Sequence, residues 1–273
     1  MLTHLKKDKV ALISALVISA LVLAAIAAPI LAPYDPLRIN LDALRLSPST
    51  SYWMGTDNMG RDVLSRLVFG ARLSLLVGVL AAALSMAIGI LIGITAGYAG
   101  GKVDSALSAL TDMVMAFPSL LLAIGITVVL PPGLLTVMLA LSVVGWASFA
   151  RLARGMVLSI KEQPFVEAAR ASGCTTPRVL FRHILPNCLP LMIIAGSLKV
   201  GSFILAESAL SFLGLGAQPP TPTWGSMVSL SRNYILSAPW TVVFPGLAIA
   251  ATVLAFNILG DSLRDWLDPK MRI

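Results

Sequence analysis

Long apolar runs alternate with short polar segments along this chain of 273 residues. A helix needs about 20 mostly apolar residues to cross a lipid bilayer. The runs that approach this length are residues 10–28, 73–96, 106–130, 134–150, 189–213 and 240–259. The pattern therefore predicts an all-α, polytopic membrane protein with six transmembrane helices.

A tight turn is expected between the third and fourth runs, because only Pro131, Pro132 and Gly133 separate them. Proline lacks a backbone donor and glycine permits a reversal of the chain, so the two helices should be antiparallel. Residues 61–72 precede the second run and predict an interfacial helix, with charges beside an apolar stripe. We divide the chain into residues 1–31 with the N-terminus and first span, residues 32–72 as an external loop, and residues 73–273 as a five-helix core with a polar loop at 151–188.

A stripe of small residues follows the second run at steps of four. It consists of Ala81, Ser85, Gly89, Gly93 and Gly97. Small side chains let another helix backbone approach closely, and close packing is a main source of attraction between helices in lipid. Glycine is common in membrane helices generally, but this regular spacing favours a helix-packing seam.

The composition agrees with a membrane protein rather than a soluble one. Apolar residues make up 57% and charged residues 12% of the chain, and the mean hydropathy is +0.88. Soluble domains carry about 25% charged residues. The net charge of +7 lies mainly beside the apolar runs, which indicates a role in membrane topology rather than in nucleic-acid binding.

The basic residues also predict an orientation, because cytoplasmic segments are enriched in lysine and arginine. They precede the first run and follow the fourth and sixth runs, which places both termini in the cytoplasm. Examples are Lys6, Lys7, Lys9, Arg151, Arg154, Arg264, Lys270 and Arg272. The expected external loop 32–72 disagrees with the rule, since it contains Arg38, Arg45, Arg61, Arg66 and Arg72.

Motifs for catalysis or for binding a metal or nucleotide are missing from the sequence. Cys174 and Cys188 are the only cysteines and form no C-x-x-C pair. The glycine-containing run at 97–102 does not match a phosphate-binding loop, because Ala96 and Val103 replace required residues. We therefore predict a subunit that is not an enzyme and binds no cofactor or metal.

Three ionisable residues lie inside or at the edge of the apolar runs, namely Asp112, Lys199 and Glu207. Such residues are expensive in a membrane and are candidates for a transport pathway. Lys199 and Glu207 are eight residues apart, so they share a helix face but are too far apart to touch. A structural pairing with polar groups on other helices is an equally good interpretation.

The polar segment after the fourth run predicts two short helices. Pro164 suits a first helical turn, Glu167 suits the positive end of the helix dipole, and Gly173 suits the position just after the helix. Thr176 and Pro177 then predict the start of a second helix, which Pro186 should end. A small helix with an alanine face suits a groove on a partner.

These residues carry a family resemblance. The stretch Glu167-Ala-Ala-Arg-Ala-Ser-Gly173, followed by Ile184-Leu-Pro-Asn187, resembles the EAA loop of binding-protein-dependent ABC-importer permeases. Nearly the whole chain is similar to the peptide/nickel permease family, specifically the C-type subunits of dipeptide, oligopeptide or nickel importers. Further motifs that carry the resemblance are Ala32-Pro-Tyr-Asp-Pro36, the stretch 55–66, Glu207-Ser-Ala-Leu-Ser-Phe-Leu-Gly-Leu-Gly216, the stretch 219–225 and the stretch 256–269.

The resemblance implies a location in a bacterial or archaeal cytoplasmic membrane, and it implies partners. They are a second homologous permease, two cytoplasmic ATPases that bind ATP and magnesium, and an external solute-binding protein. The helix at 164–172 would be the coupling helix that contacts an ATPase; the implied contact residues are Phe165, Glu167, Ala168, Ala169, Arg170, Ser172, Gly173 and Arg178. The external gate or binding-protein contact would involve Asp57, Arg61, Asp62 and Trp224.

The resemblance favours di- and oligopeptides as substrates and leaves nickel, or a nickel chelate, as the alternative. No group of His, Cys or Met residues in the apolar runs suits a bare metal ion. An ion-coupled secondary transporter would need more membrane carboxylates and repeated halves. An intramembrane hydrolase would need a catalytic pair within the spans, and neither His4 nor His183 lies in one.

Overall fold

The computed structural model describes residues 9–267, and Lys6, Lys7, Lys270 and Arg272 lie outside this range. Within it the chain is helical, with one isolated β-bridge between Thr56 and Asp62. The elements in order are α2 (Lys9–Ile26), α3 (Ala28–Leu31), η1 (Leu41–Ala43), α4 (Val63–Ala99), α5 (Gly101–Ala116), α6 (Ser119–Val129), α7 (Leu134–Ile160), α8 (Pro164–Ala171), α9 (Thr176–Val179), η2 (Leu180–Ile184), α10 (Leu185–Phe212), α11 (Trp224–Ser231), η3 (Arg232–Tyr234) and α12 (Trp240–Leu267).

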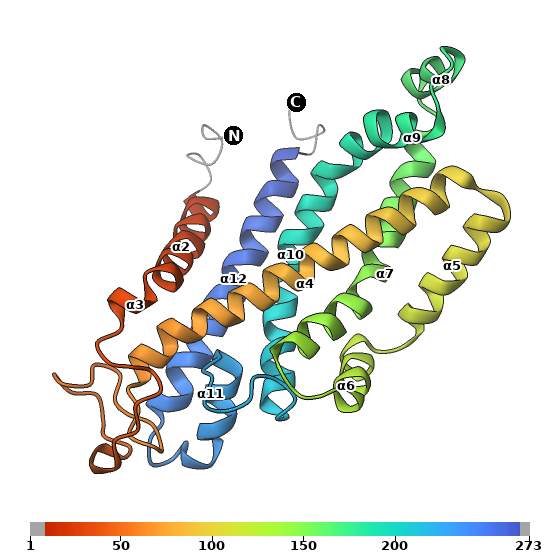
Figure 1. Cartoon of the computed structure of the whole chain (residues 1–273). Helices are drawn as coiled ribbons and strands as arrows, with labels where there is room; N and C mark the ends of the chain where they lie inside the picture. Colours follow the sequence, from red (N-terminus) through yellow and green to blue (C-terminus); the bar gives the residue numbers. More distant parts are fainter. Residues whose placement is uncertain (1–8, 268–273) are drawn as a thin grey trace.

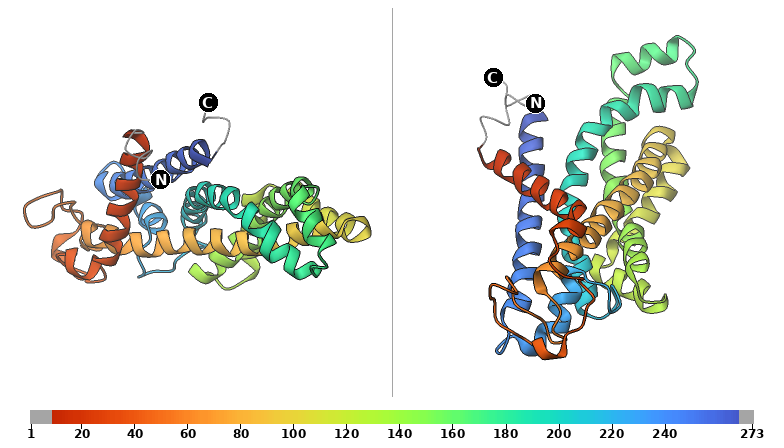
Figure 2. Two further views of the ribbon diagram at one scale, coloured as in Figure 1. Left: turned by 90° about the horizontal axis from the view of Figure 1, so that it is seen from above. Right: turned by 60° about the vertical axis from the view of Figure 1, so that its left-hand side comes forward.

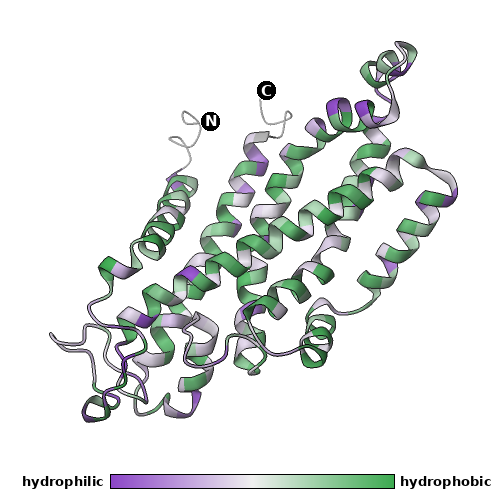
Figure 3. Cartoon of the chain, in the orientation of Figure 1, coloured by the Kyte–Doolittle hydropathy of each residue, from purple (hydrophilic) through white to green (hydrophobic). Residues whose placement is uncertain are grey.

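Five helices of the described chain are long and apolar enough to cross a membrane. They are α2, α4, α7, the continuous helix from Thr176 to Phe212, and α12. The pair α5 and α6 provides a sixth span if the two are counted together. Figure 3 shows hydrophobic residues along these helices and hydrophilic residues gathered in α8, α9 and the segment before α4. The predicted all-α membrane architecture is confirmed.

The third predicted span, 106–130, is not a straight helix. α5 ends at Ala116, α6 begins at Ser119, and the two axes differ by 87°. Phe117 has an extended backbone, with φ −92° and ψ 141°, because a residue that precedes proline is disfavoured in the helical region. Pro118 also lacks the donor that a continuous helix would use. The sequence reading missed this break, since it counted apolar residues across Pro118.

The predicted interfacial helix at 61–72 is also wrong. A single helix of 37 residues, α4, begins at Val63 and continues to Ala99. At 1.5 Å per residue it is about 55 Å long, well beyond the hydrocarbon thickness of a bilayer. In Figures 1 and 2, α4 runs from the segment before it at one end of the molecule to the neighbourhood of α9 at the other.

Pro186 does not end a short second helix, as the sequence had suggested. It lies at the start of α10, directly after the π-helical turn η2. A π-helical turn, η2, joins α9 to α10, so Thr176–Phe212 is one helix. α9 begins at Thr176 as predicted, and Thr175 occupies the N-cap position without a side-chain capping bond. Of the two short helices predicted after α7, only α8 is therefore separate.

The stripe of small residues on α4 faces α7. A Cβ added to Gly89 would lie 2.6 Å from the Trp146 carbonyl oxygen, and one added to Gly97 would lie 3.0 Å from the Arg154 oxygen. A Cβ added to Gly93 would come similarly close to the Ala150 carbonyl oxygen. The small residues thus allow the backbones of α4 and α7 to approach along much of their length.

Hydroxyl groups extend this contact beyond the glycines. The Ser85 hydroxyl donates to the Ser142 carbonyl at 3.3 Å, and the Ser142 hydroxyl lies 3.5 Å from the Ala81 carbonyl. Both serines are buried. Because the two backbones are in close contact and are joined by buried hydroxyl groups, α4 and α7 should move together as a rigid unit.

Candidate functional site

The short helix α8 is defined by its sequence at both ends. Pro164 occupies the first turn, and Glu167 lies in that turn as the dipole favours. At the other end Gly173 adopts φ +79°. Its N–H donates to the Arg170 carbonyl at 2.9 Å, and the next N–H, of Cys174, donates to the Ala169 carbonyl at 3.1 Å. These bonds form the glycine C-terminal motif that the sequence predicted.

The two faces of α8 differ in exposure. Val166 is fully buried in an apolar cluster with Val157, Val179 and Ile184. Ala169 is also buried, so this predicted contact residue faces its own chain. The remaining residues expected to contact an ATPase are exposed; they are Phe165, Glu167, Ala168, Arg170, Ser172, Gly173 and Arg178.

Val166 is the residue of this helix that the sequence reading missed. Its spacing of three from Ala169 was the available signal, because residues three apart share a helix face. A second contact links α8 to α4: the Arg170 guanidinium carbon lies 4.9 Å from the centre of the Tyr98 ring. Among the described residues Glu167 and Arg178 form no ion pair. Figure 1 shows α8 projecting from one end of the molecule.

The residues predicted to contact a binding protein lie at the other end of α4, and they are buried. Arg61 Nε lies 2.7 Å and Arg66 Nε lies 3.5 Å from Asp57 Oδ2. The Arg66 guanidinium also donates to the carbonyl oxygens of Pro36, at 3.0 Å, and Pro220, at 3.4 Å. These charges hold three segments of the same chain together.

Asp62 and Trp224 are likewise internal. One carboxylate oxygen of Asp62 accepts from the Ser65 N–H at 2.7 Å and caps α4. The Trp224 ring N–H donates to the Leu67 carbonyl at 3.0 Å, and its backbone N–H donates to the Ser74 hydroxyl at 3.2 Å. Trp224 is also the first residue of α11. These side chains therefore offer little surface to a binding protein in this conformation, while a role in an external gate stays a prediction.

Large apolar side chains occupy the exposed surface near this end instead. Trp53 is 71% exposed, Leu41 is 72% exposed and Leu236 is 98% exposed. None of them was singled out from the sequence, although Trp53 stands out within a polar stretch. These residues provide a surface that a partner can bury.

The three ionisable candidates for a pathway have different environments. Asp112 is exposed and lies 2.5 Å from Arg151. Glu207 is fully buried and accepts a hydrogen bond of 2.7 Å from the Ser211 hydroxyl. Lys199 instead lines a cavity of about 370 Å³ between α7, α10 and the junction of α5 and α6. Only Lys199 of the three lines this cavity.

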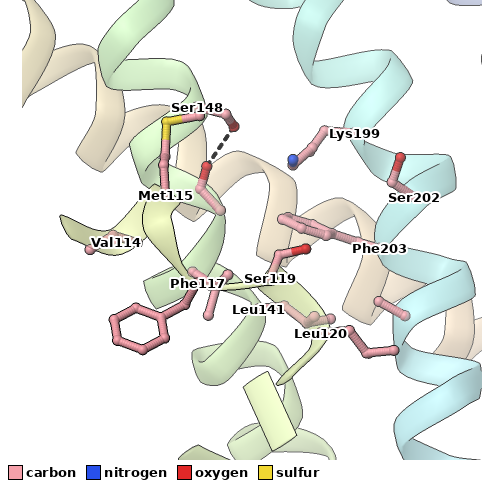
Figure 4. A pocket seen from close by; sticks show the side chains of 13 residues that line it. Val114, Met115, Phe117, Ser119, Leu120, Leu141, Ser148, Lys199, Ser202 and Phe203 are labelled. Atoms are coloured by element: carbon pink, nitrogen blue, oxygen red, sulfur yellow. Dashed lines mark hydrogen bonds between the residues drawn. The ribbon is translucent and has the colours of Figure 1, made fainter. Parts of the chain in front are cut away.

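Apolar walls and a few hydroxyls surround that cavity (Figure 4). Phe117, Met115 and Phe203 provide apolar surface, and Ser119, Ser148 and Ser202 provide hydroxyls. A second cavity, of about 440 Å³, lies between α7, α10 and α12. Ser148, Lys199 and Ser202 line both cavities, so Lys199 lies where the two adjoin. The described residues contain no group of His, Cys, Asp or Glu side chains suited to a metal ion.

The arrangement of these helices matches that of a solved transporter. In an inward-facing structure of the MetNI methionine ABC transporter, one chain aligns with 72% of this chain and 96% of its own length, with a TM-score of 0.55. The sequence identity is 19%, so the likeness concerns the fold. The fold is that of a type I ABC-importer permease, as predicted.

The family follows from the sequence matches. Residues 89–273 match the family described as binding-protein-dependent transport system inner membrane component. Residues 1–48 match the N-terminal transmembrane domain of oligopeptide transport permease C. The chain belongs to the binding-protein-dependent transport system inner membrane component family, as the EAA-type stretch indicated. Membership implies partners of two general kinds, an ATPase and a solute-binding protein.

Curated relatives agree with this placement over nearly the whole chain. The dipeptide transport system permease protein DppC of Alkalihalophilus pseudofirmus is 46% identical over 269 residues, which covers 98% of this chain and 88% of the relative. The glutathione transport system permease protein GsiD of Escherichia coli is 43% identical over 268 residues, with the same two coverages. The chain is thus a multi-pass permease subunit of a bacterial ABC importer.

Proposed function

We propose that this chain is the permease subunit of an ATP-driven importer of small peptides, and that α8 receives the force of ATP hydrolysis. The observation that carries the proposal is the exposed, capped helix α8 of a chain in this family. Its outer face exposes Phe165, Glu167 and Ala168, while its inner face is fixed to the bundle through Val166. A helix of this kind fits a groove on another subunit.

Movement of α8 would reach the membrane helices through three attachments. α8 follows α7 after a short link, the Gly173 elbow leads into the long helix from Thr176, and Arg170 stacks on Tyr98 of α4. Because α4 and α7 are closely packed, a displaced α8 should tilt them as one rigid body. ATP and magnesium would bind to two partner ATPases, while a second permease would complete the pathway.

Peptides are the substrate class that the relatives favour. The similar proteins from Alkalihalophilus pseudofirmus and Escherichia coli are named for dipeptide and glutathione transport. Both substrates are short, have amide bonds and carry free carboxylates. Nickel remains the weaker alternative, because no relative named above supports it. Membership in an ABC-importer family argues against an ion-coupled secondary transporter.

The proposed orientation places α8 and both termini in the cytoplasm. Arg61 and Arg66 had counted against this orientation, because they lie in the segment expected outside. Both are buried and lie close to Asp57, so they are structural charges rather than free loop charges, and this supports the orientation. The solute-binding protein would then meet the opposite end of α4. We expect Trp53, Leu41 and Leu236 to contribute to that contact, because they are large, apolar and exposed.

The test is uptake of a labelled dipeptide by proteoliposomes that contain both permeases and the ATPases, with the binding protein outside. Uptake should require ATP and should not follow an imposed proton gradient. Ala168→Arg, which changes the exposed face of α8, should abolish uptake. Ala99→Arg changes an exposed alanine at the end of α4 and is the matched control. Uptake that needs no ATPase, or equal uptake by the two variants, would contradict the proposal.

A further inference from the structure

Lys199 has an unusual position for a charged residue. It lies near the middle of α10, where an ammonium group is costly unless it meets water or an anion. Figure 4 shows its nitrogen directed into the space between α7 and the junction of α5 and α6. Lys199 therefore presents a positive charge to the cavity rather than to the aqueous surface.

No carboxylate of the described residues neutralises this charge. None lies within 4.0 Å of the Lys199 nitrogen. The contact recorded for the ammonium is with the face of the Phe203 ring, at 5.5 Å. By contrast, Arg151 and Arg154 on the neighbouring α7 each lie 2.5 Å from an aspartate of α5. The chain thus pairs two cations on the neighbouring helix and leaves Lys199 itself available.

The surroundings of Lys199 suit the rest of a small peptide. The Ser148 and Ser202 hydroxyls donate to carbonyl groups of their own helices, so their oxygens can accept hydrogen bonds from peptide N–H groups. Phe117 and Phe203 offer apolar surface to a side chain. The adjoining second cavity adds the amide of Asn257. Together the two cavities provide one cation, several acceptors and apolar walls.

We propose that the Lys199 ammonium binds a free carboxylate of the transported peptide as the peptide passes between α7 and α10. This inference rests on the proposed peptide-import function and assigns one of its specificity contacts. A charge-assisted hydrogen bond in a partly dehydrated site discriminates between a carboxylate and a neutral amide. The permease would thereby add its own selection to that of the binding protein.

The experiment compares Lys199→Met and Lys199→Arg with the natural chain in the complete reconstituted complex. Two probes are used: a dipeptide with a free carboxylate and the same dipeptide with a C-terminal amide. Each probe is supplied at a concentration that saturates the binding protein. That concentration is measured once for each probe with the binding protein alone, because the same binding protein is used with every permease variant. Lys199→Met should lower uptake of the free acid about tenfold and leave amide uptake unchanged. Lys199→Arg should retain most uptake of the free acid.

A matched control and a stability measurement separate this role from a structural one. Lys102→Met removes an exposed lysine at the start of α5 and should change neither probe's uptake. Lys199→Met should leave the heat stability of the complex unchanged or raise it, because removing an unpaired ammonium removes its desolvation penalty. If Lys199 instead pairs with a carboxylate of a partner, Lys199→Met should destabilise the complex and reduce both uptakes equally.

The outcomes distinguish the inference from the function on which it rests. A natural complex that transports neither probe under ATP contradicts the peptide-import function itself. Uptake of the free acid that is unchanged by Lys199→Met contradicts only the carboxylate contact. Equal loss of both probes, or loss of assembly in Lys199→Met but not in Lys199→Arg, assigns Lys199 to a structural pair and overturns the proposal.

Discussion

Polar residues gather near both ends of α4, but the charges are buried and paired at one end and exposed at the other. Near its start, Asp57, Arg61 and Arg66 are buried and compensate one another. Near its end, α8 and the segment that follows leave Glu167 and Arg178 exposed, with no ion pair among the described residues. Polar composition therefore does not show which end receives a partner. Burial and internal pairing distinguish a structural charge from one available for contact.

The comparison has an energetic basis. A charge removed from water must be compensated by partners, so a buried network is sensitive to the loss of any member. An exposed charge is already solvated, and its loss changes the free energy of unfolding little. Substitutions at the start of α4 should therefore reduce stability, while substitutions on α8 should reduce coupling. The four predictions below test this contrast, in order of their expected effect on the free energy of unfolding.

Asp57→Ala should have the largest effect, about 3–5 kcal/mol, because it leaves two buried arginines without their carboxylate. The measurement is the heat stability of the solubilised complex. Asp42→Ala, which removes an exposed acid of the same loop, is the control and should cost less than about 0.5 kcal/mol. Equal stability of the two variants would contradict the claim that the buried charges before α4 stabilise the fold.

Trp224→Phe should destabilise the protein by about 1–2 kcal/mol. The change removes the donor to the Leu67 carbonyl and leaves a small void where the larger ring was packed. Trp53→Phe, at an exposed tryptophan, should leave the unfolding temperature unchanged. A stable Trp224→Phe variant with impaired binding of the solute-binding protein would return Trp224 to the role that its sequence position suggested.

Gly173→Val should cost about 1–2 kcal/mol through backbone strain, since an added Cβ meets nothing within 4 Å but φ is +79°. Gly214 is a matched control with φ +82° and equally open surroundings at the end of α10. Gly214→Val should reduce stability by the same amount. Only Gly173→Val should also uncouple ATP hydrolysis from uptake, because only that elbow orients α8. Uncoupling by both variants would show that general strain, and not the position of α8, is responsible.

Phe165→Ala should have the smallest effect on stability, less than about 0.5 kcal/mol, because the side chain is 43% exposed. It should nevertheless weaken co-purification of the ATPase, since exposed aromatic residues often dominate the energy of an interface. Leu236→Ala, at the opposite end, should leave co-purification intact. Retention of the ATPase by Phe165→Ala would place the contact on another part of α8.

Local patterns were sufficient to predict several features correctly. The glycine end of α8 depends on residues that are adjacent in sequence, as does its proline start. The small-residue stripe of α4 could also be read directly, because it needs only helical spacing. The break at Pro118 was within reach of the same reasoning, since it follows from a local rule that the hydropathy count did not include.

Contacts between distant segments could not be predicted in this way. Arg66 meets Pro220, and Trp224 meets Leu67, across more than 150 residues of sequence. The charges around Asp57 suggested a contact surface, because the sequence shows the charged residues but not the distant segments that bury them. The same limitation applied to Lys199 and Glu207, for which the sequence predicted the same roles. The fold places Lys199 at a cavity and buries Glu207 completely.

The sequence alone determined the membrane class, the family and the position of the capped helix α8, because hydropathy, caps and motifs act over short distances. The tertiary structure decided which polar groups are compensated within the chain and which remain available. That decision depends on burial and on pairing between segments far apart in sequence. It leaves α8 free to meet a partner and Lys199 free to meet an anion, while the charges before α4 are used to hold the chain together.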